Sequence, residues 1–350
     1  MSGAPARVLV VTLRRLGDVL LTTPLIRSLK RSWPEAAIDA LVFEGTQGIL
    51  DGNPDLAGVI AMPVGPSLAE TVALLRRVWR RYDLAISTQS GDRPTLFAWA
   101  AARRSIGFVE GNNAAARLKR LALTQPLAAL RDTHRVHEVL RLAQALDLAP
   151  IGEVVLPAGR SRATVARPYA VIHAAPMFRY KRWTDQGWRA LATALGARGL
   201  PVVATGAPGD KAALDALWVG RPDVERLDGA LSWPELAALI GGASVYVGPD
   251  TSVTHLAAAS GVPTVALYGP TDPRLWGPWP VGGLDPAWSA AGTIQRRGNV
   301  WLVQNPLTCL PCQQEGCLRR RDSYSRCLDE LAVHQVLEAV DAALARPAAA

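Results

Sequence analysis

The sequence predicts an α/β protein made of two Rossmann-like domains that face each other across a cleft. Short apolar runs rich in β-branched residues alternate with helical patterns along the chain, which is typical of parallel sheets with helical crossovers. The alternation is interrupted once, by a stretch over 150–167 that is rich in Gly, Pro and Arg. The length of 350 residues also suits two domains better than one. We therefore expect ligands at the carboxyl ends of the strands.

The first domain is predicted to span residues 1–160. Its strand candidates are short runs that can be buried on both faces, and its helix candidates have apolar residues at helical spacing. Strands are expected over 8–13, 38–43, 58–62 and 83–88, and helices over 20–32, 46–50, 68–80 and 94–102.

The second domain is predicted over 161–330, followed by a C-terminal helix and tail over 331–350. Thr184 and Asp185 are start signals for its first helix, and Gly199 lies just past its end. Strands are expected over 169–173, 202–205, 244–247 and 264–268, and helices over 184–197, 211–219, 232–241, 252–260 and 331–345.

Composition limits the classes of function. Apolar residues are 49% of the chain and charged residues 19%, which excludes a disordered protein. The net charge of +8 suits an acidic partner such as a nucleotide, a nucleic acid or an anionic membrane, although a generally arginine-rich proteome would also produce it. No run reaches the roughly 18 apolar residues of a membrane helix. We expect a cytoplasmic protein, placed at the inner face of the inner membrane if it contacts a membrane at all.

Several common catalytic signatures are absent from the sequence. It has no GxGxxG after the first strand, no GxxxxGK[ST], no HExxH and no GxSxG. These absences argue against a dinucleotide-dependent dehydrogenase, a P-loop enzyme, a zinc protease and an α/β-hydrolase.

A carboxylate follows the first predicted strand, in LRRLGDVLL over 13–21. Asp18 stands beside Gly17 and behind Arg14 and Arg15. Either Asp18 only starts a helix, or it performs chemistry at the open end of a sheet.

A second motif, VGPDTSVTHLAAASG over 247–261, joins a buried strand to a helix. Amides at a helix start lack partners and favour an anion, and hydroxyl groups can add further donors. The motif therefore predicts a diphosphate site, although Asp250 can also be a simple N-cap and His255 a half-buried helix residue. Its candidate residues are Asp250, Thr251, Ser252 and His255.

Two further loops lie at predicted strand ends. Lys181 and Arg182 precede a helix. A lysine there can neutralise the negative charge of a leaving group, or the two residues can be a solvated charged pair. Asp210 follows a loop rich in Gly and Pro, where it can accept hydrogen bonds from ribose hydroxyls or complement a helix dipole.

Taken together, these motifs resemble those of the lipopolysaccharide heptosyltransferase family, whose members have the GT-B fold. The resemblance covers nearly the whole chain. The sequence LLTTPLIRSLK at 20–30, with NPD at 53–55, is most similar to the heptosyltransferase III branch. It rests on LRRLGDVLLTTPLIRSLKRSWP at 13–34, FEGTQGILDGNPD at 43–55, YKRWTDQGW at 180–188, GPDTSVTHLAAASGVPTVALYGPTDP at 248–273 and a late cysteine cluster.

The resemblance implies a role for each candidate residue. Asp18 would be the general base for the acceptor hydroxyl, with Arg14, Arg15 and Gly17 beside the acceptor in an N-terminal acceptor domain. Lys181 would contact the donor diphosphate and Asp210 the donor ribose in a C-terminal donor domain. The remaining donor residues would be His173, Asp250, Thr251, Ser252 and His255. The family usually has glycine where this chain has Ser252, a departure that adds a hydroxyl group at the donor site.

The implied reaction is the inverting transfer of heptose from ADP-heptose to a heptose of the lipopolysaccharide inner core, without a metal or other cofactor. Lys181 and a helix start would stabilise the ADP leaving group. The alternatives are a GT-B transferase that uses a UDP- or GDP-sugar, a sugar-nucleotide epimerase, and a non-catalytic nucleotide-binding protein. Nucleic-acid binding is not expected, because no recognition motif accompanies the charge.

Three other features leave alternatives open. Cys309, Cys312, Cys317 and Cys327 have a spacing that could hold a structural zinc ion, or they are reduced or locally bridged thiols. The helix over 67–82 has four arginines around an apolar stripe, so it is either an ordinary surface helix or a contact with the inner membrane or an acidic oligosaccharide. The spacing of His134 and His137 in 132–146 is compatible with a metal pair, but it lacks a third ligand nearby, so we expect a helix start capped by Asp132 or Thr133.

Overall fold

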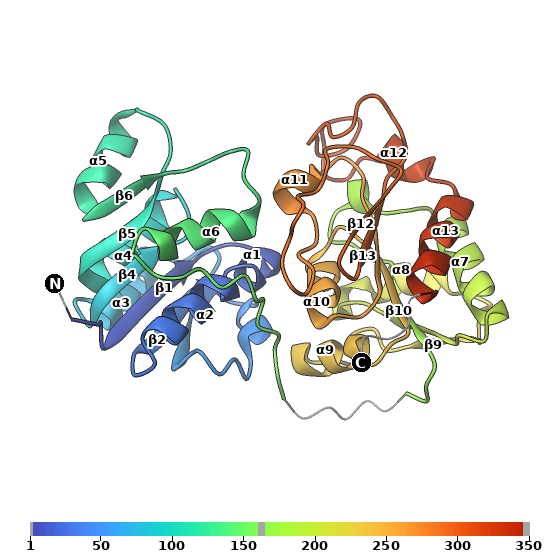
Figure 1. Cartoon of the computed structure of the whole chain (residues 1–350), viewed down its shortest axis with the longest axis horizontal. Coiled ribbons are helices and arrows are strands. Elements are labelled where there is room, and N and C mark those ends of the chain that lie inside the picture. The colour runs from blue at the N-terminus through green and yellow to red at the C-terminus, as the bar shows by residue number, and fades with distance from the viewer. Residues whose placement is uncertain (1–2, 160–164, 346–350) are drawn as a thin grey trace. The chain divides into compact units, whose positions relative to one another are not determined.

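The computed structural model describes residues 3–159 and 165–345, which form two compact units (Figure 1). The units comprise Met1–Pro157 and Ala158–Ala350. The domain boundary expected between residues 160 and 161 lies outside the described residues.

The first unit is built on a six-stranded parallel sheet with β1 near its centre. The strand order is β3 (Gly58–Met62), β2 (Ala37–Phe43), β1 (Arg7–Thr12), β4 (Tyr82–Ser87), β5 (Ala102–Val109) and β6 (Gln125–Ala128). The last five residues of β1 are buried. Because parallel strands of this kind are covered on both faces, β1 is apolar throughout rather than alternating.

Helices cover both faces of this sheet. Alternate residues of β1 enter two different cores: Val8 and Val10 pack with residues of α2 and α6, and Leu9 and Val11 pack with residues of α4 and α5. The helical segments are α1 (Leu16–Leu20), α2 (Thr23–Ser32), η1 (Gln47–Leu50), α3 (Leu68–Val78), α4 (Asp92–Ala101), α5 (Ala114–Ala122) and α6 (Arg135–Gln144).

The helix predicted over 20–32 is α2, which begins three residues later, and the separate short helix α1 ends at Leu20. Between them the Thr22 hydroxyl donates to the Asp18 carbonyl at 2.8 Å and the Thr23 hydroxyl donates to the Leu20 carbonyl at 2.8 Å. Side-chain hydroxyls that bond to nearby carbonyls compete with the helical ladder. Pro24 then fits the first turn of α2, where no amide donor is needed.

The start of the predicted linker is tied to the first unit. The Ile151 amide donates to the Ser28 hydroxyl at 2.8 Å, and the Val155 amide donates to the Thr23 hydroxyl at 2.9 Å. Arg27 on α2 pairs with Glu153 at 3.3 Å. Residues 151–155 therefore run along α2 and are held by it.

The second unit contains a seven-stranded sheet. Its order is β12 (Ile294–Arg297), β13 (Val300–Val303), β11 (Thr264–Leu267), β10 (Val245–Pro249), β7 (Ala170–His173), β8 (Val202–Thr205) and β9 (Val224–Arg226). All pairs are parallel except the edge hairpin of β12 and β13. The carboxyl ends of β10, β7 and β8 consequently lie side by side.

Two buried tryptophans, Trp183 and Trp188, pack edge to face in the core of this unit with ring centroids 5.1 Å apart. The last helix, α13, packs on α7 and on the central strands. The helical segments are η2 (Arg179–Lys181), α7 (Asp185–Ala197), η3 (Pro208–Asp210), α8 (Lys211–Leu217), α9 (Trp233–Gly241), α10 (Ser252–Ser260), α11 (Pro273–Trp276), α12 (Arg326–Asp329) and α13 (Val333–Leu344).

The junction from β10 to α10 is locked by a buried hydroxyl pair. The Tyr246 and Thr254 hydroxyls lie 3.0 Å apart, and Thr254 also donates to the Pro249 carbonyl at 2.5 Å. This packing requires glycine at position 248, because a Cβ there would lie 2.2 Å from the Tyr246 hydroxyl oxygen.

We predict that Gly248→Ala lowers the unfolding free energy of the protein by about 2 kcal/mol or more, because the buried Tyr246 ring must move. Urea unfolding followed by fluorescence measures the effect. Gly196→Ala on α7 is the matched control: its Cβ meets nothing within 4 Å, so it should stabilise the helix by about 0.5 kcal/mol. Equal effects of the two substitutions would contradict this packing.

Candidate active site

A buried ion pair lies at the carboxyl edge of the second sheet. Asp250 follows β10, and its Oδ2 atom is 2.6 Å from Lys181 Nζ. The same oxygen accepts a hydrogen bond from the Thr271 hydroxyl at 2.5 Å. Three loops therefore meet at this carboxylate: the η2 turn, the β10–α10 junction and the loop after β11.

The charge of Asp250 is stabilised by these partners. Burial alone would raise the pKa of this carboxyl, but Lys181, Thr271 and the charged form of His255 outweigh burial, so the pKa is lowered. Burial and the Asp250 carboxylate together raise the pKa of the neighbouring Tyr268 well above its usual value. Tyr268 and Thr271 lie within the motif quoted at 248–273, but neither was among the candidates.

Thr251, not Asp250, caps α10. The Thr251 hydroxyl accepts a hydrogen bond from the Thr254 amide at 3.4 Å, whereas the Asp250 carboxylate faces Lys181. The expectation of Asp250 as a simple N-cap is therefore wrong. Ser252 is the first residue of α10, where a serine is readily accommodated, and buried His255 follows one turn later.

His173 ends β7, beside the end of β8. Its Nδ1 atom lies 3.1 Å from the Thr205 hydroxyl, and its register partner is Thr205. Burial lowers the pKa of His173 to about 4, against a weaker opposing effect of Thr205. At neutral pH this imidazole is uncharged, so it can offer a ligand a hydrogen bond but no positive charge.

Asp210 and Arg182 have local partners instead of joining the ion pair. Asp210 Oδ2 accepts a hydrogen bond from the Ala207 amide at 2.8 Å, which closes the turn before α8. Arg182 pairs with Asp185 at 2.8 Å, in the first turn of α7. The observed contact thus fits the alternative in which Asp210 has a structural role at a helix start. A contact with ribose would use the other oxygen, Oδ1.

In the first unit, Asp18 lies in the first turn of α1, and it is 8% exposed. Its Oδ1 atom is 3.3 Å from Arg14 Nε and 3.8 Å from Arg135 Nε. Among the residues that the structure describes, none donates a hydrogen bond to this buried oxygen. A buried acceptor left open in this way costs stability, which makes it a candidate for function.

The other acceptor-side candidates, Arg15 and Gly17, are close to Asp18 along the chain. Arg15 is the N-cap residue of α1, with extended backbone and no side-chain capping bond, and Gly17 is the second residue of the helix. The Gly17 carbonyl accepts the Leu21 amide at 2.9 Å. Arg14 and Arg15 are exposed, while Gly17 is half-buried.

Arg135 is a site residue that the sequence analysis missed. It begins α6, is buried, and donates to the Thr88 carbonyl at 3.1 Å while its Nε faces Asp18. Burial lowers the pKa of Arg135, and Asp18 opposes that shift. The cap of α6 also differs from expectation: His134 Nδ1 accepts the Val136 amide at 3.2 Å, in place of Asp132 or Thr133.

The four cysteines are free thiols in this structure. Cys327 is buried, and burial together with the three other cysteines raises its pKa to about 12. Within residues 3–159 and 165–345, no group of three or more His, Cys, Asp or Glu side chains is placed to hold a metal ion. The zinc hypothesis thus gains no support, and the locally bridged alternative is not what is observed.

Comparison with known proteins decides the family. Residues 71–282 match the model of glycosyltransferase family 9 (heptosyltransferase). The chain belongs to this family. It is therefore a glycosyltransferase, as predicted, and membership argues against the epimerase and the non-catalytic binding protein.

Named relatives agree with this assignment. The enzyme is 32% identical over 285 residues to lipopolysaccharide heptosyltransferase 3 of Escherichia coli, a match that covers 75% of this chain and 83% of that protein. It is 28% identical over 348 residues to lipopolysaccharide heptosyltransferase 1 of Pseudomonas aeruginosa, covering 95% and 93%.

The predicted GT-B fold is confirmed by solved structures. The enzyme is similar to Escherichia coli heptosyltransferase WaaC with ADP, with a TM-score of 0.73 and 22% identity over 96% of this chain and 99% of that chain. It is equally similar to Escherichia coli ADP-heptose heptosyltransferase II, with a TM-score of 0.73 and 20% identity over 97% and 98%.

The pKa of His173 predicts how stability depends on pH. An unfolded histidine titrates near 6.5 and the folded one near 4, so the unfolded chain binds more protons between these values. The contribution of neutral His173 to the free energy of unfolding is therefore fully present above pH 6.5. It is lost as the pH falls from 6.5 toward 4. We expect this group to cost about 2 kcal/mol between pH 7.5 and 5.0.

His173→Asn should remove that part of the pH dependence, measured by urea unfolding at the two pH values. His334→Gln, at an exposed position of α13, is the control and should change nothing. Equal acid sensitivity of the wild type and His173→Asn would contradict the burial of a neutral imidazole.

Proposed function

We propose that this enzyme transfers heptose from ADP-heptose to a heptose of the lipopolysaccharide inner core. The donor assignment rests mainly on one observation: a lysine, Lys181, lies beside the N-terminus of α10 at the carboxyl edge of the second sheet. Cations and helix amides at that place suit a nucleoside diphosphate. The relative WaaC was solved with ADP, and the relatives named above are lipopolysaccharide heptosyltransferases.

The proposed reaction is a single displacement. The acceptor hydroxyl oxygen attacks the anomeric carbon, the bond from that carbon to the diphosphate oxygen breaks, and ADP leaves with the bonding electrons. The hydroxyl proton passes to Asp18, which acts as general base. One displacement inverts the anomeric configuration.

The surroundings of Asp18 support this role. Its open Oδ1 atom has an unused acceptor position, while Arg14 and Arg135 stabilise the negative charge without a hydrogen bond to that oxygen. Arg14 and Arg15 are exposed beside it, so they can also bind phosphate groups of the acceptor. Gly17 provides the half-buried backbone next to the base.

The donor site divides its tasks among several residues. One of the three N–H groups of Lys181 points to Asp250. The other two can contact the diphosphate without breaking the ion pair. Asp250 holds Lys181 and is a positioning residue. The contacts with the donor that we propose come from Lys181, His173, Asp210, Thr251, Ser252 and His255.

Substitution of the base separates chemistry from binding. Asp18→Asn should lower kcat by about 10²–10⁴-fold because the amide accepts no proton, while ADP affinity measured by calorimetry is unchanged. Lys181→Met should instead affect donor binding and weaken the affinity for ADP by roughly tenfold. Glu35→Gln, an exposed acid of the first unit, is the control and should match the wild type. An unchanged kcat in Asp18→Asn would remove Asp18 from the mechanism.

The leaving group in this proposal is stabilised by Lys181 and by the amides of α10, so turnover should not require a divalent ion. We expect the same kcat after dialysis against EDTA as in the presence of Mg²⁺. Activity that disappears with EDTA and returns with a metal would show that another cation carries this charge.

A further inference from the structure

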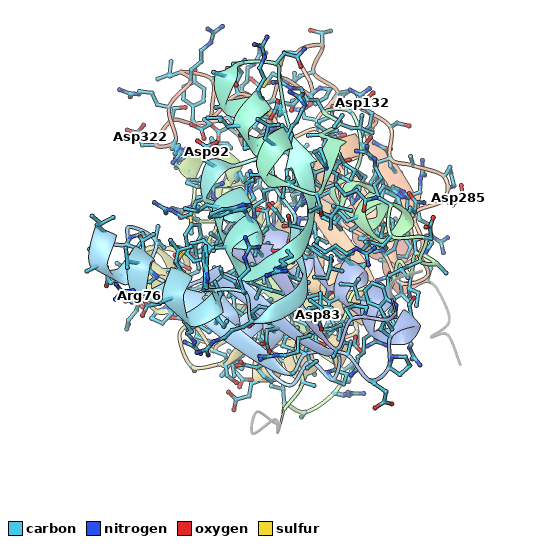
Figure 2. The ribbon with its side chains drawn as sticks, turned by 90° about the vertical axis from the view of Figure 1, so that its left-hand side faces the viewer. Arg76, Asp83, Asp92, Asp132, Asp285 and Asp322 are labelled. Atoms are coloured by element: carbon cyan, nitrogen blue, oxygen red, sulfur yellow. The ribbon has the colours of Figure 1, made fainter. Side chains whose placement is uncertain are left out.

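One helical layer of the first unit has an unusual surface. The helices α3, α4 and α5 lie in succession on one face of the sheet, with α4 packed against both neighbours (Figure 2). Large apolar side chains project from this layer into solvent, and the most exposed are Leu121 at 84% and Leu68 at 80%. The complete set is Leu68, Trp79, Leu96, Trp99, Leu118 and Leu121.

Two of these side chains form a rigid aromatic and cationic cluster. Trp79 and Trp99 meet edge to face with ring centroids 5.7 Å apart, and the Arg80 guanidinium lies 5.2 and 5.5 Å from the two ring centroids. Arg80 also donates to the Trp99 carbonyl at 3.0 Å and to the Ala102 carbonyl. The tryptophans are 50% and 38% exposed, so they are fixed at the surface and not in the core.

The backbone is adapted to hold this cluster. Arg80 has a φ of +51°, in the left-handed region that non-glycine residues seldom occupy. Its amide donates to the Ala100 carbonyl at 2.9 Å, which joins the end of α3 to the end of α4. Such a conformation costs energy and persists only when its surroundings determine it.

Most of the net positive charge of the chain lies in the same segment. Residues 67–122 contain ten Arg and Lys against four Asp and Glu, a net charge of +6 out of +8 for the protein. The acids have local partners: Glu70 caps α3 through Ser67, Asp92 pairs with Lys119, Asp83 accepts two amides, and Glu110 pairs with Arg131. The exposed arginines of α3, Arg76 and Arg77, keep their charge available (Figure 2 labels Arg76).

The chemistry of this layer favours one kind of partner. Tryptophan and arginine together suit the headgroup region of a bilayer, and exposed leucines can enter the acyl boundary below it. A nucleic acid would use the rings and the charge but not Leu68, Leu118 and Leu121. A second copy of the chain would bring the same positive charge and be repelled.

We propose that the surface formed by α3, α4 and α5 docks on the anionic phospholipid surface of a membrane. None of the helices described in residues 3–159 and 165–345 is long and apolar enough to cross a bilayer, so binding at this layer is peripheral. The arginines attract the anionic headgroups, and the Trp79–Trp99 cluster and the leucines add apolar contact.

Sedimentation with vesicles tests the proposal. The full-length enzyme should bind vesicles of phosphatidylcholine with 30% phosphatidylglycerol and not vesicles of phosphatidylcholine alone, and NaCl should weaken the binding. Arg76→Gln/Arg77→Gln should reduce the partition coefficient by about fivefold per arginine, roughly 25-fold in total. Trp79→Ala/Trp99→Ala should reduce it by about tenfold.

Two control variants make the result specific. Arg76→Lys/Arg77→Lys keeps the charge and should bind like the wild type. Arg296→Gln/Arg320→Gln removes two exposed arginines of the second unit and should also bind like the wild type. Circular dichroism of each variant establishes that it is folded.

The proposal is overturned by any of three results. These are no binding to anionic vesicles, equal loss in both arginine-to-glutamine pairs, or a concentration-dependent dimer that the tryptophan substitutions abolish. The vesicle assay contains neither nucleotide nor acceptor. Its failure would therefore leave the proposed transfer reaction untouched, and loss of ADP binding would leave the docking surface untouched.

Discussion

The ion pair between Lys181 and Asp250 is the interaction around which the second unit is arranged. Burying a carboxylate costs several kcal/mol unless partners surround it, and here Lys181 and Thr271 supply them. Because these partners come from different loops, the pair holds together the segments after β7, β10 and β11. The start of α10 follows directly after Asp250, so the direction of its first amides is set by the same contact.

The two buried carboxylates of the candidate sites, Asp250 and Asp18, have different environments. Asp250 is held on one oxygen by a lysine and a hydroxyl, which fixes its position. Asp18 has arginines near it but keeps one oxygen without a donor among the described residues. A carboxylate held in an ion pair positions its neighbours, whereas one with an open oxygen can take up a proton. The different environments therefore support the different roles that we propose for them.

Much of the fold was predictable because local signals and burial agree. The strand at 202–205 and the helix at 252–260 were predicted with their observed bounds, since an apolar run and an N-cap hydroxyl mark them. The strand β5 was missed because Arg103 and Arg104 interrupt its pattern and it follows α4 without a loop. The hairpin of β12 and β13 was missed for a similar reason, as its first strand is polar.

The candidate sites were predictable only in part. Residues inside a strand-to-helix motif, such as Asp18 and Asp250, were recognised from their positions. Their partners Arg135 and Thr271 lie 117 and 21 residues further along the chain, and only the folded structure brings them close. Which residue caps α10 was also beyond the sequence, because Asp250 and Thr251 are both good caps and the ion pair decides between them.

The buried histidine at the end of β7 has a consequence for the pH dependence of this strand edge. With a pKa of about 4, only about 1% of His173 side chains carry a proton at pH 6. The charge that His173 contributes at this edge is therefore the same at pH 6 as at neutral pH. A nucleotide bound there, as we propose, would meet the same imidazole, uncharged, across that range.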